Sequence, residues 1–598
     1  MELVIKAITF RRDIQALRGV AVLLVVLYHL KIPGFYNGFI GVDIFFVISG
    51  YLMASIYNSK SSKMFFIKRA RRLLPAYWAT LILSLLVGFV VLAPSDFLQL
   101  KNQILMSMLF IPNFFFWAQN SYFQVTDFNP LLNLWSLGVE FQFYLLVPLL
   151  CHIFSRNKKL FNFIFVALLI ACLVVLTISP KTSFFLIPFR LWEFMFGYYI
   201  LTNNHKLRPK HIYFALFVFV LILFYPHLDG FSSSIFSGHP GLISLVVVLI
   251  TGLVIKIGFN SGQNIFIKIL IKIGDYSYAI YLIHFPVIIF YNYSPFGGTI
   301  LGFDTTRDFI TLAALIVLLG LALHKFVELP GFSSKLRMRV FLAVGLLIIP
   351  LVFISPILQS SKFSGVQKNI AYSVQDRSQY RCGKIFRILN PRSKTCALSS
   401  IKSNSRILLL GNSHADSIKT TFTSIAQEYN YEVYFWVSNN PLMSTGSSVK
   451  EVLSEIKDKK IKHVFIHYSD GAVSKEKFSE LFSELDYLRV TVSFLGPIPV
   501  WPEIVPEVLW SIREPNRVLS QNYSESSERN LYSLKTLEQL SGEKFKFYDM
   551  ASILCDFECI FINSSGKLLY WDSSHLTLTG SNLYMPLFRK ALLDLKRF

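Results

Sequence analysis

Two short polar motifs in the C-terminal third of the chain contain the residue types of serine-based catalysis. The first, ILLLGNSHADS at residues 407–417, is an apolar run that ends in a turn of small residues carrying Ser413. The second, WDSSHLTLTG at residues 571–580, places Asp572 three residues before His575. This spacing allows Asp572 to hold one ring nitrogen of His575 while the other nitrogen points at Ser413. The motifs together predict a serine nucleophile, a histidine base and an aspartate that orients the base.

A second set of reactive side chains lies in apolar segments of the N-terminal half. Arg18 and His29 are separated by ten residues in RGVAVLLVVLYH. Eleven helical steps of about 1.5 Å place them roughly 16 Å apart along the axis, on one face of a helix. Ionised groups inside a bilayer cost at least about 2.5 to 3.5 kcal/mol each, so such residues are candidates for function. The others are Asp43 in GVDIFFVISGYL, Glu140 in WSLGVEFQFY, Arg190 and Glu193 in RLWEFMFG, and His284 in YSYAIYLIHFP.

These groups also allow a structural interpretation. Arg190 and Glu193 could form a structural ion pair, and His29 or His284 could be a packing histidine with a hydrogen-bonded ring. Several costly groups in one bundle nevertheless indicate a shared polar interior, because each must face another polar group or a wet cavity. The set therefore favours a functional site inside the bundle.

The elements that must hold these residues are apolar helices followed by a less apolar part. The chain has 598 residues, of which 53% are hydrophobic, and a mean hydropathy of +0.50. It is too apolar for one soluble domain and too long for one core. Segments long enough to cross a bilayer occur only before residue 358. We expect eleven transmembrane helices, at residues 13–30, 38–57, 73–93, 133–154, 160–178, 184–201, 212–227, 240–256, 275–292, 308–326 and 340–357.

Basic residues predict the orientation of this bundle. The net charge of +22 is concentrated beside apolar segments, as in FIKRARR (66–72), SRNKK (155–159) and HKLRPKH (205–211). This pattern favours positive-inside topology over nucleic-acid binding. With a cytoplasmic N-terminus, the basic connections all fall on the cytoplasmic side only if the short apolar stretch 104–117 is re-entrant or interfacial. Residues after 358 would then lie outside the cytoplasm.

Residues 405–598 have the pattern of alternating strands and helices. RILLLG, YEVYFWV, HVFIHYS, RVTVSFLG and FKFYDM are predicted strands, and SSVKEVLSEIKD and SKEKFSELFSEL are predicted helices. This order predicts an α/β domain with a parallel sheet. Ligands of such sheets bind at the carboxyl ends of the strands, where Ser413 lies. Residues 358–404 form a connector that we expect to pack on this domain, because it is too long for a bare tether.

The part expected outside the cytoplasm contains four cysteines: Cys382, Cys396, Cys555 and Cys559. Disulfides form in such oxidising compartments. Sequence alone allows three pairings of four cysteines, and we expect 382 with 396 and 555 with 559. Cys151 and Cys172 lie in apolar segments and are expected to pack as apolar groups.

Five motifs in order resemble the acyltransferase-3 family of bacterial membrane O-acyltransferases. They are RDIQALRGVAVLLVVLYH, GVDIFFVISGYL, RRLLPAY (71–77), WSLGVEFQFYLL and YSYAIYLIHFP. The resemblance covers residues 8–330, so that 340–357 would be an additional transmembrane helix. It implies that Arg18 serves acyl-CoA use and that His29 serves acyl transfer.

The chemistry of the side chains agrees with such roles. Acyl transfer from a thioester needs a general base or a transient nucleophile with a pKa near neutrality, and imidazole supplies either. Arginines near the cytoplasmic face could bind the phosphates of coenzyme A, although positive-inside anchoring also explains them. The candidates for acyl-CoA binding and acyl transfer are Arg18, Arg69, Arg71, Arg72, Asp43, Glu140 and His284, and no metal is expected.

GNSH and DSSH resemble the first and last blocks of the SGNH hydrolase family, and the chain order Ser, Asp, His also occurs in other α/β hydrolases. The middle blocks of that family usually supply a glycine and an asparagine to the oxyanion hole. Here the expected strand end reads HYSDGA (467–472), without asparagine. Asn439 or Asn440 in VSNNPLM could stand near the second block. The backbone amide of Ser413 is the only oxyanion donor that we expect.

The two halves together resemble bacterial polysaccharide O-acetyltransferases. They imply an enzyme that moves acetyl from cytoplasmic acetyl-CoA across the inner membrane, through His29 and then Ser413, to a sugar hydroxyl. The expected acceptor is lipopolysaccharide O-antigen or a lipid-linked glycan, with the C-terminal domain in the periplasm. The alternatives are a peptidoglycan O-acetyltransferase and, from another class, a transporter with an exported esterase or sugar-binding module.

Overall fold

The computed structural model divides into two compact units, and each is described by itself. The helical unit contains the residues up to Leu92 and Asp96–Gln359, and the sheet unit contains Ala93–Ser95 and the residues from Ser360 onward. The structure describes residues 11–119, 127–202, 211–225, 232–258, 264–328, 334–379, 382, 383, 386, 389, 390, 393–437, 447–469, 475–512 and 545–595.

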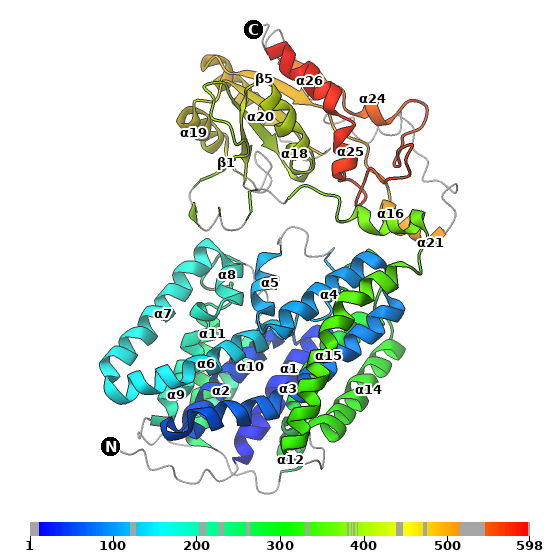
Figure 1. Ribbon diagram of the computed structural model, residues 1–598. Helices are drawn as coiled ribbons and strands as arrows, with labels where there is room; N and C mark the ends of the chain where they lie inside the picture. The colour runs from blue at the N-terminus through cyan, green and yellow to red at the C-terminus, as the bar shows by residue number, and fades with distance from the viewer. Residues whose placement is uncertain are drawn as a thin grey trace. The chain divides into compact units, whose positions relative to one another are not determined.

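The first unit is built from helices, as its long apolar segments predict (Figure 1). Their bounds are α1 (Arg12–His29), α2 (Gly41–Ile56), α3 (Ser62–Val91), α4 (Pro94–Met108), α5 (Pro112–Ala118), α6 (Leu134–Arg156), α7 (Lys158–Ile178), α8 (Pro180–Phe185), α9 (Leu191–Thr202), α10 (His211–Phe224), α11 (Leu242–Ile257), α12 (Ile265–Asp275), α13 (Ser277–Tyr291), α14 (Thr306–Leu323) and α15 (Ser334–Ser360).

Length and composition identify membrane-crossing candidates among these helices. In the part of the chain that the structure describes, five helices are long and apolar enough to cross a membrane, or up to seven if each of two bent pairs is one span. One bent pair is α12 with α13, which meet at 72°. The apolar helices α10 and α11 are shorter. The unit therefore has the character of a membrane domain, and the count of eleven crossings stays a prediction.

The stretch 104–117, which we predicted not to cross, is divided between two helices. It begins inside α4, which ends at Met108, and continues in α5, which is seven residues long. A helix of this length rises only about 10 Å at 1.5 Å per residue. Pro112 is the first residue of α5, a position where the missing proline N–H costs no helical hydrogen bond.

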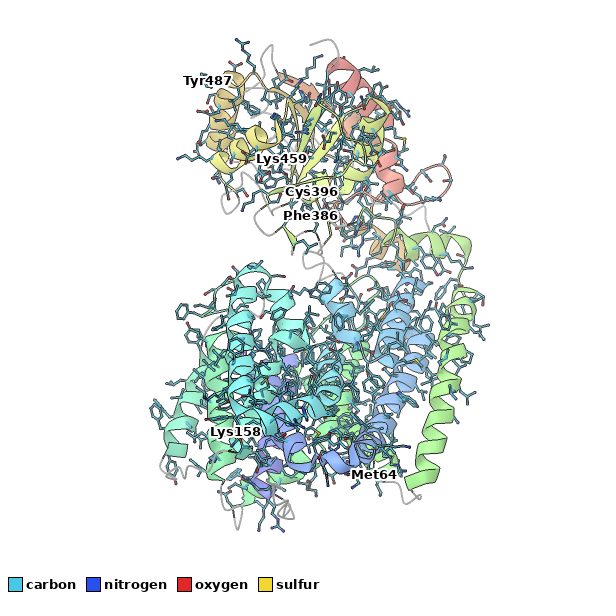
Figure 2. The ribbon with its side chains drawn as sticks, turned by 60° about the vertical axis from the view of Figure 1, so that its left-hand side comes forward. Met64, Lys158, Phe386, Cys396, Lys459 and Tyr487 are labelled. Atoms are coloured by element: carbon cyan, nitrogen blue, oxygen red, sulfur yellow. A yellow bond between two sulfur atoms is a disulfide. The ribbon has the colours of Figure 1, made fainter. Side chains whose placement is uncertain are left out.

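Two of the basic segments begin near the same end of the helical unit. Met64, in the first turn of α3, and Lys158, the first residue of α7, lie near that end in Figure 2. This placement agrees with the positive-inside pattern, because residues 66–72 and 155–159 carry clusters of lysine and arginine.

Small residues bring pairs of helices into close contact. A Cβ atom added at Gly50 of α2 would lie 2.0 Å from the carbonyl oxygen of Phe194 in α9, and one at Gly197 would lie 2.2 Å from that of Val47. Glycine therefore permits the backbones of α2 and α9 to touch, as in other membrane helix pairs. This contact positions Asp43, near the start of α2, beside the residues that begin α9.

The second unit contains a six-stranded sheet in the order β1-β3-β2-β4-β5-β6. Neighbouring strands from β3 to β6 in this order are parallel, and β1 pairs with β3 in the antiparallel sense. The strands are β1 (Thr395–Ala397), β2 (Arg406–Gly411), β3 (Glu432–Trp436), β4 (His463–His467), β5 (Thr491–Leu495) and β6 (Phe545–Tyr548). The helices are α16 (Gly365–Ser373), α18 (Ser413–Glu428), α19 (Val449–Lys459), α20 (Lys475–Tyr487), α21 (Val505–Ile512), α24 (Ala551–Leu554), α25 (Leu578–Asn582) and α26 (Met585–Asp594).

Alternating side chains place helices on both faces of the sheet. Leu408 and Leu410 of β2 share one buried cluster with residues of α19 and α20. Phe465 of β4 packs against Phe422 of α18, and α18 in turn packs against α25 and α26. Successive strand residues point to opposite faces, so the predicted parallel sheet is covered on both sides, as its continuous apolar strands require.

The connector joins the sheet unit as an edge strand, which the sequence did not indicate. Residues Thr395–Ala397 form β1 at the edge of the sheet. Disulfides join Cys382 to Cys396, which lies on β1, and Cys555 to Cys559; Figure 2 labels Cys396. Of the two other cysteines, Cys172 is buried, and both are free thiols.

Candidate active sites

The first candidate site is formed at the carboxyl end of β2. Ser413 is the first residue of α18 and directly follows the strand and Asn412. The side chain of Asn412 caps the helix by accepting a hydrogen bond from the backbone N–H of His414 at 3.0 Å. A Cβ atom at Gly411 would lie 1.9 Å from the carbonyl oxygen of His467. Glycine therefore allows the turn that carries Ser413 to lie directly against the end of β4.

Ser413, His575 and Asp572 form one hydrogen-bonded chain. The Nε2 atom of His575 lies 2.7 Å from Ser413 Oγ, and its Nδ1 lies 2.6 Å from Asp572 Oδ2. Asp572 Oδ1 also accepts hydrogen bonds from the backbone N–H groups of Ser574 and His575, at 2.8 and 2.7 Å. Because Asp572 holds Nδ1–H, Nε2 carries the lone pair that can remove the proton from Ser413.

The connector contacts the loop that carries His575. Trp571 stacks on His575 with ring centroids 5.1 Å apart and an interplanar angle of 17°. The guanidinium of Arg377 lies over the ring of Trp571, 5.2 Å from its centroid. Asp376 accepts hydrogen bonds from the backbone N–H and the hydroxyl of Thr579, at 3.1 and 2.6 Å. The connector therefore packs against the loop of His575 through Arg377 and Asp376.

The sequence pattern did not predict the pair of Asn412 and Ser469 beside Ser413. Asn412 Nδ2 donates a hydrogen bond to Ser469 Oγ at 2.6 Å. Ser469 follows β4 in the HYSDGA segment, at the strand end where the SGNH resemblance implies an asparagine. A serine hydroxyl that accepts one hydrogen bond still has its proton to donate. The signal in the sequence was weak, because serine is common at strand ends. Asn439 and Asn440 lie outside the described residues.

Two further buried histidines lie near the triad. The rings of His414 and His575 have centroids 5.0 Å apart, and those of His414 and His467 lie 6.1 Å apart. Burial lowers the pKa of His467 to about 4. Burial, and then the charges of His575 and His467, lower the pKa of His414 well below its ordinary value. Both rings are therefore neutral at pH 7, and only His575 has the carboxylate partner of a base.

The helical unit contains two cavities lined by the predicted polar residues. We call the first the arginine cavity; it has a volume of about 80 Å³. Its polar lining residues are Arg18, Ser49, Arg69, Arg72, Ser136, Glu140, Tyr144, Ser277, Tyr278 and Tyr281. Glu140 accepts hydrogen bonds from Ser49, at 2.5 Å, and from Tyr144. Arg71 is not among the lining residues. The arrangement concentrates three guanidinium groups around one carboxylate.

The second cavity, which we call the histidine cavity, has a volume of about 430 Å³ and is lined by His29. Val42 and Tyr281 line both cavities, so the two cavities are neighbours. Arg18 and His29 therefore belong to different but adjacent cavities, as their separation along α1 predicts.

His284 lies beside His29 and determines which nitrogen of His29 is protonated. The Nδ1 atom of His284 lies 2.8 Å from the carbonyl oxygen of Tyr281, so this nitrogen must donate. Its Nε2 lies 3.2 Å from His29 Nδ1 and is left as the acceptor. His29 Nδ1 then carries the hydrogen, and His29 Nε2 carries a lone pair, the state that a base or nucleophile needs.

Asp43 lies in a buried ion-pair network rather than beside His29. Arg190 Nη1 lies 3.1 Å from Asp43 Oδ1 and 2.8 Å from Glu193 Oε1, and all three side chains are fully buried. His239 Nε2 lies 3.3 Å from Asp43 Oδ1. His239 is in the segment SGHPG, outside any apolar run, so sequence patterns did not identify it. The predicted ion pair of Arg190 and Glu193 is therefore present, and Asp43 and His239 belong to the same network.

No group of three or more histidine, cysteine, aspartate or glutamate residues that could hold a metal ion occurs within the described ranges.

Comparisons with known proteins agree with this two-part organisation. The family described as "Acyltransferase domain" matches residues 11–325. The family described as "SGNH domain (fused to AT3 domains)" matches residues 381–590. No solved structure matches the chain.

Two relatives from Staphylococcus aureus illustrate the similarity. "Putative O-acetyltransferase" of strain MSSA476 is 30% identical over 355 residues, which are 54% of this chain and 58% of the relative. "O-acetyltransferase OatA" of strain MRSA252 is 28% identical over 391 residues, which are 59% of this chain and 64% of the relative. The chain thus spans less than two thirds of the length of these relatives. Because the acyltransferase match covers more than half of the chain, the protein belongs to the acyltransferase family, in the form that carries a fused SGNH domain.

Proposed function

We propose that the protein is a membrane O-acetyltransferase that moves an acetyl group from acetyl-CoA to a sugar hydroxyl of an envelope polysaccharide. The observation that carries this proposal is the chain of Asp572, His575 and Ser413, with 2.6 and 2.7 Å contacts, in a protein of the acyltransferase family. The names of the relatives, which are O-acetyltransferases, support the choice of acetyl.

The arginine cavity is the proposed binding site of the acyl donor. Arg18, Arg69 and Arg72 line it, and guanidinium groups pair well with the phosphates of coenzyme A. Arg71 would act from outside the cavity, near the same surface. The pantetheine arm would pass between Val42 and Tyr281 towards His29, whose Nε2 lone pair can accept the acyl group or remove a proton from its acceptor.

The sheet unit would complete the transfer in two balanced steps. In the first, His575 removes the proton from Ser413, Ser413 Oγ bonds to the acyl carbon, the bond from that carbon to the group that delivered it breaks, and this group leaves with the proton from His575. In the second, His575 removes the proton of a sugar hydroxyl, the sugar oxygen bonds to the acyl carbon, and Ser413 Oγ leaves and recovers the proton. The Ser413 backbone N–H and the Ser469 hydroxyl would bind the carbonyl oxygen as it gains charge. Water must be excluded from the second step, or the ester would be hydrolysed.

The proposed location is the bacterial inner membrane, with a cytoplasmic N-terminus and a periplasmic sheet unit. The lysine and arginine clusters that follow Met64 and surround Lys158, two residues near the same end of the helical unit, support this orientation. The two disulfides of the sheet unit support an oxidising compartment. Such an arrangement places the acyl donor and the polysaccharide acceptor on opposite sides of the membrane, which explains why one chain would carry two sites.

Lipopolysaccharide O-antigen is the first acceptor to test, with peptidoglycan as the alternative. The acetyl content of both glycans would be measured by mass spectrometry in strains that carry His29→Ala or Ser413→Ala at matched membrane abundance. Exposed residues of the same types give matched controls, His152→Ala and Ser511→Ala. We expect both site variants to lose acetylation of one glycan and both controls to keep it. Loss with His29→Ala alone would reject the role of Ser413, and unchanged acetylation of both glycans would reject the function.

A further inference from the structure

Arg190 is a cationic side chain of the histidine cavity to which the proposed function gives no role. It lines this cavity together with His29, and its side chain is 0% exposed. Three of its contacts are internal: Nε donates to the carbonyl oxygen of Phe184 at 3.0 Å, and Nη1 contacts Asp43 and Glu193. Its Nη2 atom is buried and has no hydrogen-bond partner among the described residues.

An unpaired Nη2 points to a ligand, because a buried donor without a partner costs about 1 to 3 kcal/mol and more when it is charged. The rest of the guanidinium is held firmly, so Nη2 cannot turn away to another partner without breaking the contacts of Nη1. The rings of Phe46, Trp135 and Phe184 lie 5.1 to 6.0 Å from the guanidinium carbon and confine it further.

The charges around Arg190 indicate a neutral ligand. Asp43 and Glu193 already supply two carboxylates to one guanidinium, and each has an oxygen that is buried without a hydrogen-bond partner. An anionic phosphate or carboxylate would approach these two acids and be repelled. A neutral carbonyl oxygen would accept a hydrogen bond from Nη2 without that penalty.

The remaining lining indicates a small group with few polar atoms. The cavity wall includes the aromatic rings of Phe116, Trp135, Phe184 and Phe185. Its amide side chains are mostly paired with protein: Gln119 and Asn129 exchange hydrogen bonds at 2.8 and 3.1 Å, and Asn133 Nδ2 donates to Tyr281 at 2.8 Å. A sugar ring carries several hydroxyl groups, and Arg190 Nη2, the unpartnered Asn133 Oδ1 and the lone pair of His29 Nε2 are few partners for them.

We propose that the histidine cavity binds the acyl group itself and that Arg190 Nη2 donates a hydrogen bond to the acyl carbonyl oxygen. Asp43 and Glu193 are positioning residues that hold the guanidinium in place for this contact. The inference rests on the proposed function, because it takes the acyl group of acyl-CoA as the ligand.

Two coenzyme A thioethers that cannot transfer an acyl group test this contact. Acetonyl-CoA has a carbonyl oxygen, and S-propyl-CoA has a methylene in its place. Binding of each, and of free coenzyme A, would be measured on the full-length protein in lipid nanodiscs. A hydrogen bond from a charged donor predicts that the wild-type protein prefers acetonyl-CoA over S-propyl-CoA by roughly 10- to 100-fold.

Variants at Arg190 would remove this preference while leaving the affinity for free coenzyme A unchanged. Arg190→Lys keeps a cation for the two carboxylates but lacks the second nitrogen arm. If that variant does not fold, the pair Arg190→Gln with Glu193→Gln removes one charge of each sign and leaves Asp43 beside His239. Arg156→Gln, which changes an exposed arginine, is the control and should keep the preference.

The outcomes separate this inference from the proposed function. Equal wild-type binding of the two thioethers, or a preference that persists without Arg190, would overturn the role of Arg190 and leave acetyl-CoA as the donor. Absence of binding of free coenzyme A by the wild-type protein would overturn the donor itself, and the Arg190 contact with it.

Discussion

The residues around Ser413 are small, polar or neutral, and each contributes to its position or to its hydrogen bonds. Gly411 permits the close approach of β4, Asn412 caps α18, and Asp572 orients His575. The nearby rings of His414 and His467 are neutral at pH 7 because burial lowers the pKa of each. Of these three imidazoles, only that of His575 is paired with a carboxylate.

Replacement of Ser469 tests the side-chain part of the oxyanion hole. In Ser469→Ala, Asn412 loses its hydroxyl partner and the carbonyl oxygen would lose a donor. We expect the rate at which the full-length protein releases p-nitrophenol from p-nitrophenyl acetate, which reports the first transfer step and needs no acceptor, to fall roughly 10²- to 10³-fold. Ser511→Ala, at an exposed serine, should leave the rate unchanged. A normal rate in Ser469→Ala would leave the Ser413 backbone amide as the donor.

His467 makes the sheet unit sensitive to acid. Its pKa is about 4 in the folded protein, mainly because burial disfavours the charged ring, and about 6.5 when unfolded. The unfolded state therefore binds more protons between these values, so stability is fully present above about pH 6.5 and is lost as the pH falls towards 4. The difference corresponds to roughly 3 kcal/mol.

A non-titrating side chain should reduce this pH dependence. Hydrogen exchange of the β4 and β5 amides in the full-length protein would be compared at pH 7 and pH 4.5 for the wild type and His467→Gln. We expect protection in the wild type to fall more steeply with pH than in the variant. Equal slopes would show that His467 is not a source of the acid sensitivity.

At the scale of elements, close helix contacts position the residues of the histidine cavity. The glycines between α2 and α9 bring Asp43 and Arg190 together, and those between α1 and α12 act similarly, because a Cβ at Gly19 would lie 2.1 Å from the carbonyl oxygen of Leu270. In the sheet unit, the connector contributes an edge strand and contacts the His575 loop. Elements distant from each reaction centre therefore determine its geometry.

Gly50→Leu would separate α2 from α9. Its Cβ would meet backbone atoms at 2.0 Å, and backbone cannot yield as a flexible side chain does. We expect a destabilisation above the roughly 1 to 3 kcal/mol of ordinary overpacking, measured as a lower unfolding temperature of the protein in nanodiscs. Gly365→Leu is the matched control, since a Cβ there has no atom within 4 Å. Equal unfolding temperatures in the two variants would contradict the role of this contact.

At the scale of the whole molecule, the two units each contain a histidine that can accept a proton. His29 is held by His284, and His575 is held by Asp572. The proposed function uses the two in series, because the donor and the acceptor would lie on opposite sides of the membrane.

A double variant tests this serial use. If His29 and Ser413 act in successive steps of one reaction, the double variant His29→Ala/Ser413→Ala should retain as much glycan acetylation as the more defective single variant. Residual acetyl content by mass spectrometry, at matched protein abundance, gives the comparison. Residual activities that multiply in the double variant would indicate two independent routes.

The sequence by itself determined the features that depend on local pattern. Apolar length predicted a helical half, strand and helix periodicity predicted the parallel sheet around Ser413, and the motifs at residues 407–417 and 571–580 predicted that Ser413, Asp572 and His575 lie together. Each motif lies within one short segment, but the contact that joins the two motifs spans 162 residues and was predicted from the residue types and not from spacing.

Only the tertiary structure decided which distant groups meet. His284 joins His29 across 255 residues, Arg190 joins Asp43 across 147, and Ser469 joins Asn412 across 57. The sequence pattern likewise did not predict the edge strand β1 or the contact of His239 with Asp43. The physical reason is that these contacts depend on helix and strand packing, which is set by the fit of many side chains and glycines over whole elements and not by the residues that make the contact.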